Sequence, residues 1–324
     1  MKTCFIGGTG RCGTSILRTI LSRHSRVATL PIEHRLTVDP DGIFDFYRSY
    51  TSGWSPYYAD ARLTRLKNFL EELSSTNPVH KIFRYLFRAF RLAGLSITPK
   101  KYLDVELSHF IPNYSEHVNT LLNELVEFEY TGERLGTGSY SFNNKIQYAP
   151  NYSKEQLKKI FQNFIHSFIQ DILTHNHKDC FIEDNTWNIL FSADLLDLIP
   201  NAKIISVIRD PRDVVASLSK QKWMPSNKAQ SAKIYNDLIV EWIEIRRNLD
   251  KQSWIEVRLE DVVLEPESQI RKICDFIELP WEDNLLEIDL SKSNSGRWKK
   301  DFSVEEQRSV IPLLAEHIKS FGYE

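Results

Sequence analysis

The residues best suited to chemistry lie near the start of the chain, in a run rich in glycine. Positions 5–6 are apolar and indicate the end of a buried strand, whereas positions 16–21 carry apolar residues at helical spacing. The run between them contains one cation, Arg11, and the glycines Gly7, Gly8, Gly10 and Gly13. Glycines let the backbone approach an anion closely, and the first N–H groups of a helix point back into such a turn. The pattern predicts a cradle for a phosphate or sulfate group.

This run departs from the loops that bind nucleoside triphosphates. Gly8, Gly13 and Ser15 match the spacing G-x-x-x-x-G-K-[ST], but Thr14 stands where that pattern has lysine. In nucleoside triphosphatases the lysine contacts the terminal phosphates and the hydroxyl binds magnesium. The loss of the lysine therefore argues against ordinary ATP or GTP hydrolysis. Arg11 offers a planar fork of donors for a phosphate or sulfate instead. A glycine-rich turn without a ligand is the alternative.

A second pattern follows a later strand. Positions 203–208 predict a buried strand that ends at Arg209, and Asp210 fits the N-cap of the helix that comes next. Ser217 would lie about two turns into that helix. Arg209 and Ser217 could therefore bind one anion at the edge of the sheet. In the alternative, Arg209 pairs with Asp213 and Ser217 is merely exposed.

Three ionisable residues follow the second predicted strand, at about positions 24–30. They are Glu33, His34 and Arg35, and they would lie at the carboxyl end of that strand. Ligands of open parallel sheets bind at this edge. The sequence leaves two possibilities open: a catalytic group, or a surface ion pair.

Composition narrows the class of protein. The 324 residues include 41 Lys and Arg against 43 Asp and Glu, so the net charge of −2 favours no nucleic-acid partner. The first predicted strand begins within a few residues of Met1, and no apolar run is long enough to cross a bilayer. We therefore expect a cytoplasmic protein without a membrane span. The cysteines lack C-x-x-C spacing, which predicts neither a metal site nor disulfides: Cys4, Cys12, Cys180 and Cys274.

Buried strands separated by helices predict an α/β fold, in which a parallel sheet is flanked by helices on both faces. We expect one domain, 1–324, with a helical insertion at about 36–150. Ser153 and Gln156 predict a capping box that begins a long amphipathic helix. The basic stretch 80–101 reads as a solvated helix face or as a site for an acidic acceptor or lipid headgroups.

Together, the two anion patterns resemble the sulfotransferase family, which uses 3'-phosphoadenosine 5'-phosphosulfate (PAPS) and has a P-loop NTPase-like fold. The first run is similar to the family's 5'-phosphosulfate loop in its arginine-bearing form, although Cys12 stands where serine is usual. By this resemblance the loop residues that bind PAPS are Gly10, Arg11, Cys12, Gly13, Thr14 and Ser15.

Two later segments carry the rest of the resemblance. Positions 207–218 are similar to the 3'-phosphate motif, which implies that Arg209 and Ser217 bind the 3'-phosphate. Positions 294–299 are similar to the family's basic cofactor loop, which implies cofactor contacts by Gly296, Arg297, Trp298 and Lys299.

The resemblance also implies a reaction, the in-line transfer of a sulfuryl group to a hydroxyl or amine. Arg11 and Thr14 would hold the phosphosulfate. Protein-tyrosine sulfotransferases have a similar Glu-x-Arg after the loop, which implies Glu33 as the general base and Arg35 as a contact to the sulfate or acceptor. His34 is the second candidate for the base on its chemistry alone.

One position departs from the family: Asp184 stands where many members have a lysine near the leaving group. Lys299, Lys220 or Arg11 would then have to supply the positive charge. The acceptor stays open between a small molecule and a peptide. The insertion at about 36–150, on the acceptor side, and the region around Trp223 are expected to shape its pocket. The alternatives are a P-loop kinase of nucleotides or small molecules, and a nucleotide-binding protein without catalysis; no oligomeric state is indicated.

Overall fold

The computed structural model describes residues 1–74, 82, 86, 102, 105–132, 145–290 and 294–323. The chain forms two compact units: Met1–Thr29 together with Lys178–Glu324, and Leu30–His177. The expected insertion at 36–150 falls within the second unit. Most of the basic stretch 80–101 lies outside the described residues.

The first unit is built on a five-stranded sheet in the order β2-β5-β1-β6-β7, and every neighbouring pair is parallel. Its strands are β1 (Lys2–Gly8), β2 (Val27–Ala28), β5 (Cys180–Asp184), β6 (Lys203–Ile208) and β7 (Trp254–Arg258). Ile6 of the central strand pairs with Asp184 on one side and Ile205 on the other. The carboxyl ends of β1, β5 and β6 therefore meet at one edge, where the loop after Gly8 begins.

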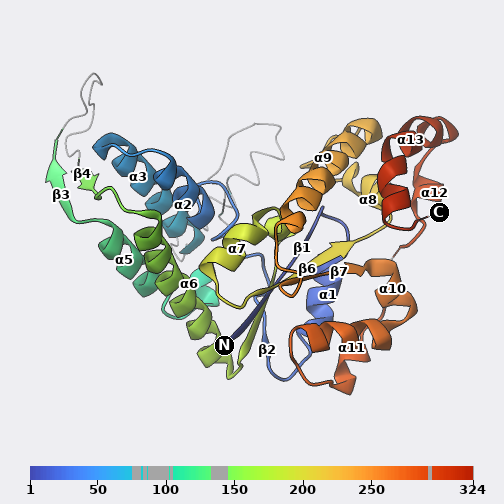
Figure 1. Cartoon of the computed structure of the whole chain (residues 1–324), viewed down its shortest axis with the longest axis horizontal. Coiled ribbons are helices and arrows are strands. Elements are labelled where there is room, and N and C mark those ends of the chain that lie inside the picture. The colour runs from blue at the N-terminus through green and yellow to red at the C-terminus, as the bar shows by residue number, and fades with distance from the viewer. Residues whose placement is uncertain are drawn as a thin grey trace. The chain divides into compact units, whose positions relative to one another are not determined.

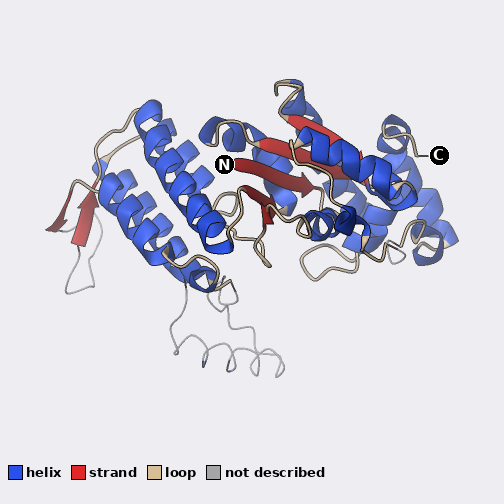
Figure 2. Ribbon diagram, turned by 90° about the horizontal axis from the view of Figure 1, so that it is seen from below, coloured by secondary structure: helices blue, strands red, loops and turns tan. Residues whose placement is uncertain are grey.

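Helices cover both faces of this sheet (Figures 1 and 2). In Figure 1, α1, α10 and α11 lie on one side of the strands, and α7 and α9 lie on the other. The helices are α1 (Thr14–Leu21), α7 (Ser192–Leu198), α8 (Pro211–Leu218), α9 (Lys228–Arg247), α10 (Leu259–Leu264), α11 (Pro266–Phe276), α12 (Trp298–Asp301) and α13 (Val304–Ser320), with 3-10 turns η2 (Thr186–Phe191) and η3 (Asp283–Leu286). This arrangement confirms the predicted fold class.

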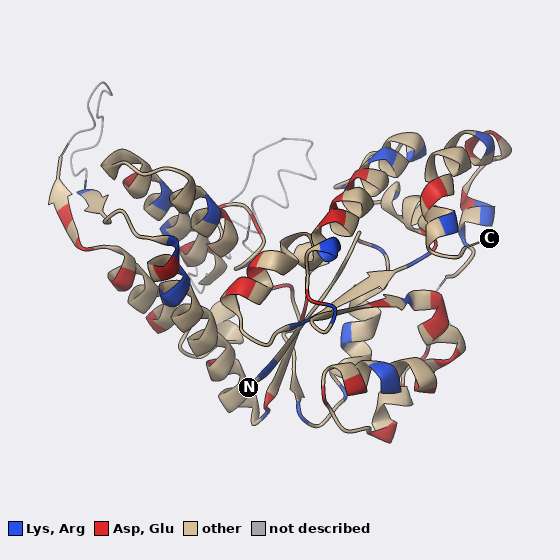
Figure 3. Ribbon diagram, in the orientation of Figure 1, with Lys and Arg blue, Asp and Glu red and all other residues tan. Residues whose placement is uncertain are grey.

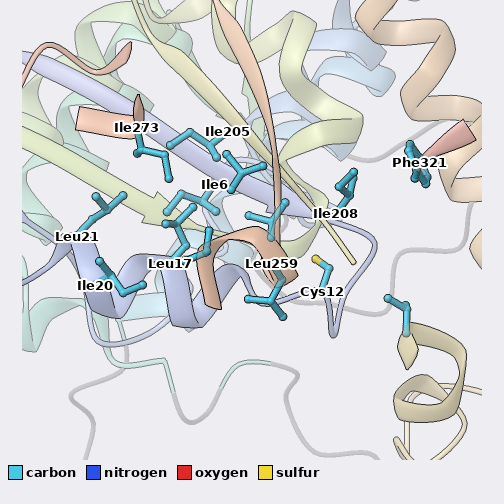
Figure 4. Close-up of a cluster of buried hydrophobic side chains, with 14 of the residues drawn as sticks. Ile6, Cys12, Leu17, Ile20, Leu21, Ile205, Ile208, Leu259, Ile273 and Phe321 are labelled. Atoms are coloured by element: carbon cyan, nitrogen blue, oxygen red, sulfur yellow. The ribbon is translucent and has the colours of Figure 1, made fainter. Parts of the chain in front are cut away.

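The core of the first unit lies directly beneath the glycine-rich loop. β1 and β6 are buried over nearly their whole length, as expected for parallel strands covered on both faces. Figure 4 shows Ile6, Leu17, Ile205 and Leu259 packed in one cluster, together with Cys12 from the loop itself. The loop therefore rests on close-packed side chains that restrict its movement.

The second unit is mainly helical. It contains α2 (Ile43–Ser52), α3 (Pro56–Ser74), η1 (Leu107–His109), α5 (Tyr114–Leu125), α6 (Lys154–Asn176) and an antiparallel pair of strands, β3 (Phe128–Thr131) and β4 (Lys145–Tyr148). The predicted capping box is confirmed, because Ser153 Oγ accepts from the Gln156 N–H and Gln156 Oε1 accepts from the Ser153 N–H. Aromatic side chains fill the interior; Phe46 stacks on Tyr50, and its ring meets the edge of Phe161.

Figure 3 shows charged residues of both signs on the helices of each unit. Among the helices that the structure describes, none combines the length and the apolar character that a membrane crossing requires.

Candidate anion-binding site

The loop between β1 and α1 has the backbone geometry of an anion cradle. Gly10, Arg11 and Gly13 all have left-handed φ values, of 81°, 58° and 107°. Successive N–H groups in such a turn point toward one concave side. Gly13 caps α1, because its carbonyl accepts from the N–H groups of Ile16 and Leu17. The first N–H groups of a helix have no acceptor within the helix, so they can serve a ligand bound at the loop.

Gly13→Ala should destabilise the protein by at least about 2 kcal/mol. A left-handed φ costs a non-glycine residue about 1–2 kcal/mol, and a Cβ at Gly13 would stand 2.7 Å from Leu259 Cδ1. Urea unfolding of the two proteins measures the difference. Gly296→Ala is the matched control: φ at Gly296 is 75°, but a Cβ there would meet nothing within 4 Å. Equal losses in the two variants would contradict a packing contribution from Leu259.

The side chain of Cys12 lies within its own loop, where backbone N–H groups of Thr9, Gly10 and Thr14 act on the thiol. It is 0% exposed and packs beneath the loop against Gly8. Burial raises the pKa of its thiol to about 11, so the group stays protonated at neutral pH.

Arg11 joins the loop to the second predicted anion motif. Its Nε donates to Ser217 Oγ at 3.1 Å. Arg209 Nη1 in turn donates to the Arg11 carbonyl at 3.3 Å. The structure thus brings together Arg11, Arg209 and Ser217, which lie far apart in the sequence. Their donors converge where the carboxyl ends of β1 and β6 adjoin.

Asp213 attaches the third predicted motif to the same place. Its carboxylate is 0% exposed and accepts from the N–H of Gly296 at 2.6 Å and of Trp298 at 2.9 Å. Arg209 Nη2 lies 3.5 Å from that carboxylate and donates to the Asn294 carbonyl at 2.7 Å. In the sequence analysis, an Arg209–Asp213 pair was the alternative to anion binding. The contacts of Asp213 with the 294–298 segment were not predicted.

The other residues of this segment are placed by side-chain contacts. The Arg212 guanidinium lies over the ring of Trp298, with its Cζ 4.5 Å from the ring centroid. Asp301 pairs with Arg297 at 2.8 Å and with Lys220 at 2.7 Å. Lys299 is exposed, with its ammonium 5.8 Å from the Trp298 ring. Asp301 thus engages two of the cations in this part of the chain, Arg297 and Lys220.

The departure at Asp184 is accompanied by a cation from α1. Arg18 Nε lies 2.6 Å from Asp184 Oδ1, and only 6% of the Asp184 side chain is exposed. Burial raises the pKa of Asp184, while Arg18 and a hydrogen bond from Ser15 act in the opposite direction. Sequence analysis did not single out Arg18. The feature that could have identified Arg18 from the sequence is its spacing, because it follows Thr14 by one helical turn on α1.

The predicted catalytic residues Glu33 and Arg35 lie in the second unit. Arg35 Nη2 is 2.6 Å from Glu33 Oε2, and its Nη1 is 3.6 Å from Asp39 Oδ1. Arg35 also has a left-handed φ of 64°. Residues whose neighbours hold the backbone at left-handed φ values occur often at functional sites. About a third of each side chain of the Glu33–Arg35 pair is exposed, at 30% and 36%, so both remain accessible.

His34 lies inside the second unit. It is 1% exposed, its Nδ1 accepts from the Leu36 N–H at 3.1 Å, and its ring meets the edge of Phe168 at 5.7 Å. Burial, with a contribution from Arg35, lowers the pKa of the imidazole to about 3. This environment counts against His34 as the base, because a buried, weakly basic ring is poorly placed to take a proton from a substrate.

Comparison with known proteins agrees with this geometry. A family model described as "Sulfotransferase family" matches residues 4–283. The chain is 28% identical over 153 residues to Protein-tyrosine sulfotransferase A of Caenorhabditis elegans, a match that covers 43% of this chain and 40% of that protein. It is 25% identical over 182 residues to Omega-hydroxy-beta-dihydromenaquinone-9 sulfotransferase Stf3 of Mycobacterium bovis, covering 51% of this chain and 47% of that one. The chain thus spans less than half the length of these relatives.

Among solved structures, the sulfotransferase domain from the Synechococcus PCC 7002 olefin synthase superposes with a TM-score of 0.50 at 15% identity, over 100% of this chain and 95% of that one. This likeness concerns the fold, and it agrees with the predicted α/β class. The resemblance drawn from the sequence motifs is confirmed by the family model, which spans most of the chain. The chain belongs to the sulfotransferase family.

Proposed function

We propose that this protein is an enzyme that transfers a sulfuryl group from PAPS to a hydroxyl or amine. The observation that carries the proposal is the convergence of Arg11 with Ser217 and Arg209, which joins two anion motifs into one site. The donor set fits a nucleotide with an anionic group at each end: the loop N–H groups and Arg11 for one, Arg209 and Ser217 for the other. When bound, PAPS would supply the activated sulfuryl group.

The three motifs would have different roles in the reaction. The cradle and Arg11 bind the phosphosulfate end and offer donors where negative charge develops. Asp213 holds the 294–298 segment beside Arg209. In this position the segment would shield the 3'-phosphate end from water. The lack of the loop lysine, with Thr14 in its place, disfavours a kinase.

Glu33 is our candidate for the general base that takes the proton of the acceptor. Its carboxylate is oriented by Arg35 at 2.6 Å and is partly exposed, as a base that meets a substrate must be. Arg35 is held in turn by Asp39.

The acceptor and the location of the protein are also proposals. The relatives named protein-tyrosine sulfotransferase support a peptide or small-molecule acceptor with a hydroxyl group. The four cysteines are all free and buried, which is compatible with the reducing cytoplasm that we propose.

Thermal stabilisation by 3',5'-adenosine bisphosphate (PAP) tests the cofactor assignment. At about a hundredfold its dissociation constant, PAP should stabilise the wild type by about 3 kcal/mol. Arg209→Ala should lose nearly all of this effect, because it removes the guanidinium of the 3'-phosphate site. Arg271→Ala is the matched control, since Arg271 pairs with Glu267 on the surface of α11. Stabilisation by ATP with magnesium, and none by PAP, would replace the proposal with the kinase.

A further inference from the structure

The turn that ends α13 directs Tyr323 back into the core of the first unit. Gly322 has a left-handed φ of 72°, and the N–H of Tyr323 donates to the Ile318 carbonyl at 2.8 Å. A hydrogen bond of this span around a glycine is typical of the Schellman motif, which turns the chain at the end of a helix. Tyr323 is only 7% exposed and belongs to the core cluster that also contains Val257 and Leu259. A tyrosine hydroxyl in such a place normally has a hydrogen-bond partner.

The partner of the Tyr323 hydroxyl is Glu260, in the first turn of α10. The hydroxyl donates to Glu260 Oε2 at 2.7 Å, and the Cζ of Arg258 lies over the Tyr323 ring, 4.4 Å from its centroid. Burial and the Glu260 carboxylate raise the pKa of the Tyr323 hydroxyl, so this group stays protonated at neutral pH. Tyr323 is therefore a permanent donor to one oxygen of Glu260.

The second oxygen of Glu260 reaches the nucleotide motif that follows β6. Glu260 Oε1 accepts from the Asp210 N–H at 3.1 Å. That N–H belongs to the peptide bond between Arg209 and Asp210, so the contact holds the backbone directly at Arg209. Asp210 in turn binds Nε and Nη2 of Arg212, at 2.9 Å and 2.8 Å, and caps α8. Glu260 thus connects Tyr323 to the junction of β6 and α8.

The backbone at Arg209 depends on this contact because the strand has already ended. β6 ends at Ile208, which pairs with Arg258 at the end of β7. The contact with Glu260 continues the support of the sheet by one further residue. A guanidinium binds a phosphate through a rigid fork of donors, so a small rotation of the backbone would misalign the Arg209 fork.

We propose that Glu260 and Tyr323 are positioning residues for the 3'-phosphate of the cofactor. They act through the Arg209–Asp210 peptide, whose direction sets the position of the Arg209 guanidinium. This inference rests on the proposed function, since it concerns how a residue of the PAPS site is held. It adds to that site two residues that lie outside its anion motifs.

Calorimetry with PAP and with adenosine 5'-monophosphate (AMP), which lacks the 3'-phosphate, tests the inference. A positioning role predicts a lower ratio of PAP affinity to AMP affinity, whereas a general loss of folded protein would affect both ligands alike. Glu260→Ala and Glu260→Gln remove the same charge, but glutamine keeps an oxygen that can accept from the Asp210 N–H. The ratio should fall about tenfold in Glu260→Ala, the usual cost of losing a hydrogen bond to a charged group, and by at most about threefold in Glu260→Gln.

Tyr323→Phe removes the hydroxyl alone and should lower the ratio about threefold, because Glu260 loses one of its two donors. Tyr114→Phe is the matched control. The Tyr114 side chain is 0% exposed, and its hydroxyl donates to the Leu70 carbonyl at 3.0 Å within the second unit. This variant also loses a buried hydrogen bond, yet it should keep the wild-type ratio.

A wild-type ratio in Glu260→Ala, or PAP and AMP affinities that fall by the same factor, would overturn the inference. Equal ratios in Glu260→Ala and Glu260→Gln would also overturn it, since the effect would then come from charge and not from the contact with Asp210. An unchanged ratio in Tyr323→Phe would remove Tyr323 from the proposal. A wild type that binds PAP no more tightly than AMP would contradict the proposed function itself.

Discussion

Glu33→Gln should lower turnover by about 10²–10⁴-fold, which is the usual contribution of a positioned general base. The amide keeps the size of the side chain and an oxygen that can accept from Arg35, but it cannot take a proton. PAP affinity should stay within about twofold, since the residues proposed to bind PAP all lie in the first unit. Release of PAP from PAPS in the presence of a hydroxyl-bearing acceptor measures turnover, and calorimetry measures PAP affinity.

Glu71→Gln provides the comparison for this variant. Glu71 is an exposed carboxylate on α3 of the same unit, so its loss should leave both turnover and PAP affinity at wild-type values. If Glu33→Gln turned over as fast as the wild type, Glu33 would not be the base. The Glu33–Arg35 ion pair would then be an ordinary surface pair, the alternative that the sequence left open.

Much of the anion site was predictable because its signals are local. A strand, a glycine-rich turn and a helix occupy consecutive positions around Arg11, and the same holds for the strand and helix around Arg209. Apolar runs and capping residues specify such junctions without knowledge of the fold. The parallel sheet then brings the junctions to one edge.

The contacts that the sequence did not predict join residues far apart in the chain. Asp213 accepts from Gly296 and Trp298, and Asp184 meets Arg18, yet no local pattern links the members of either group. The direction in which Cys12 points was also unpredictable, since it depends on the core beneath the loop. The four-residue strand β3 is exposed at every position and gives no alternation from which to predict it.

Asp213→Ala should lower the free energy of unfolding by about 3–5 kcal/mol, the cost of removing one partner from a buried ion pair. The substitution leaves the Arg209 guanidinium without its carboxylate and takes the acceptor from two N–H groups of the 294–298 segment. Urea unfolding measures the loss. Asp301→Ala is the control: Asp301 pairs with Arg297 and Lys220 but is more exposed, so its loss should cost at most about 1 kcal/mol.

Asp213→Ala also distinguishes two possible roles of Asp213 in ligand binding. If its charge merely opposed an incoming anion, its removal would tighten PAP binding. We expect weaker binding, by tenfold or more, because hydrogen bonds to a charged acceptor contribute about 1.5–3 kcal/mol each and two of them hold the segment beside Arg209. Hydrogen exchange at 294–298 should be faster in Asp213→Ala than in Asp301→Ala, which removes a side-chain contact to Arg297 but leaves the N–H groups of Gly296 and Trp298 with their acceptor. Tighter PAP binding with a protected segment would assign Asp213 to charge balance alone.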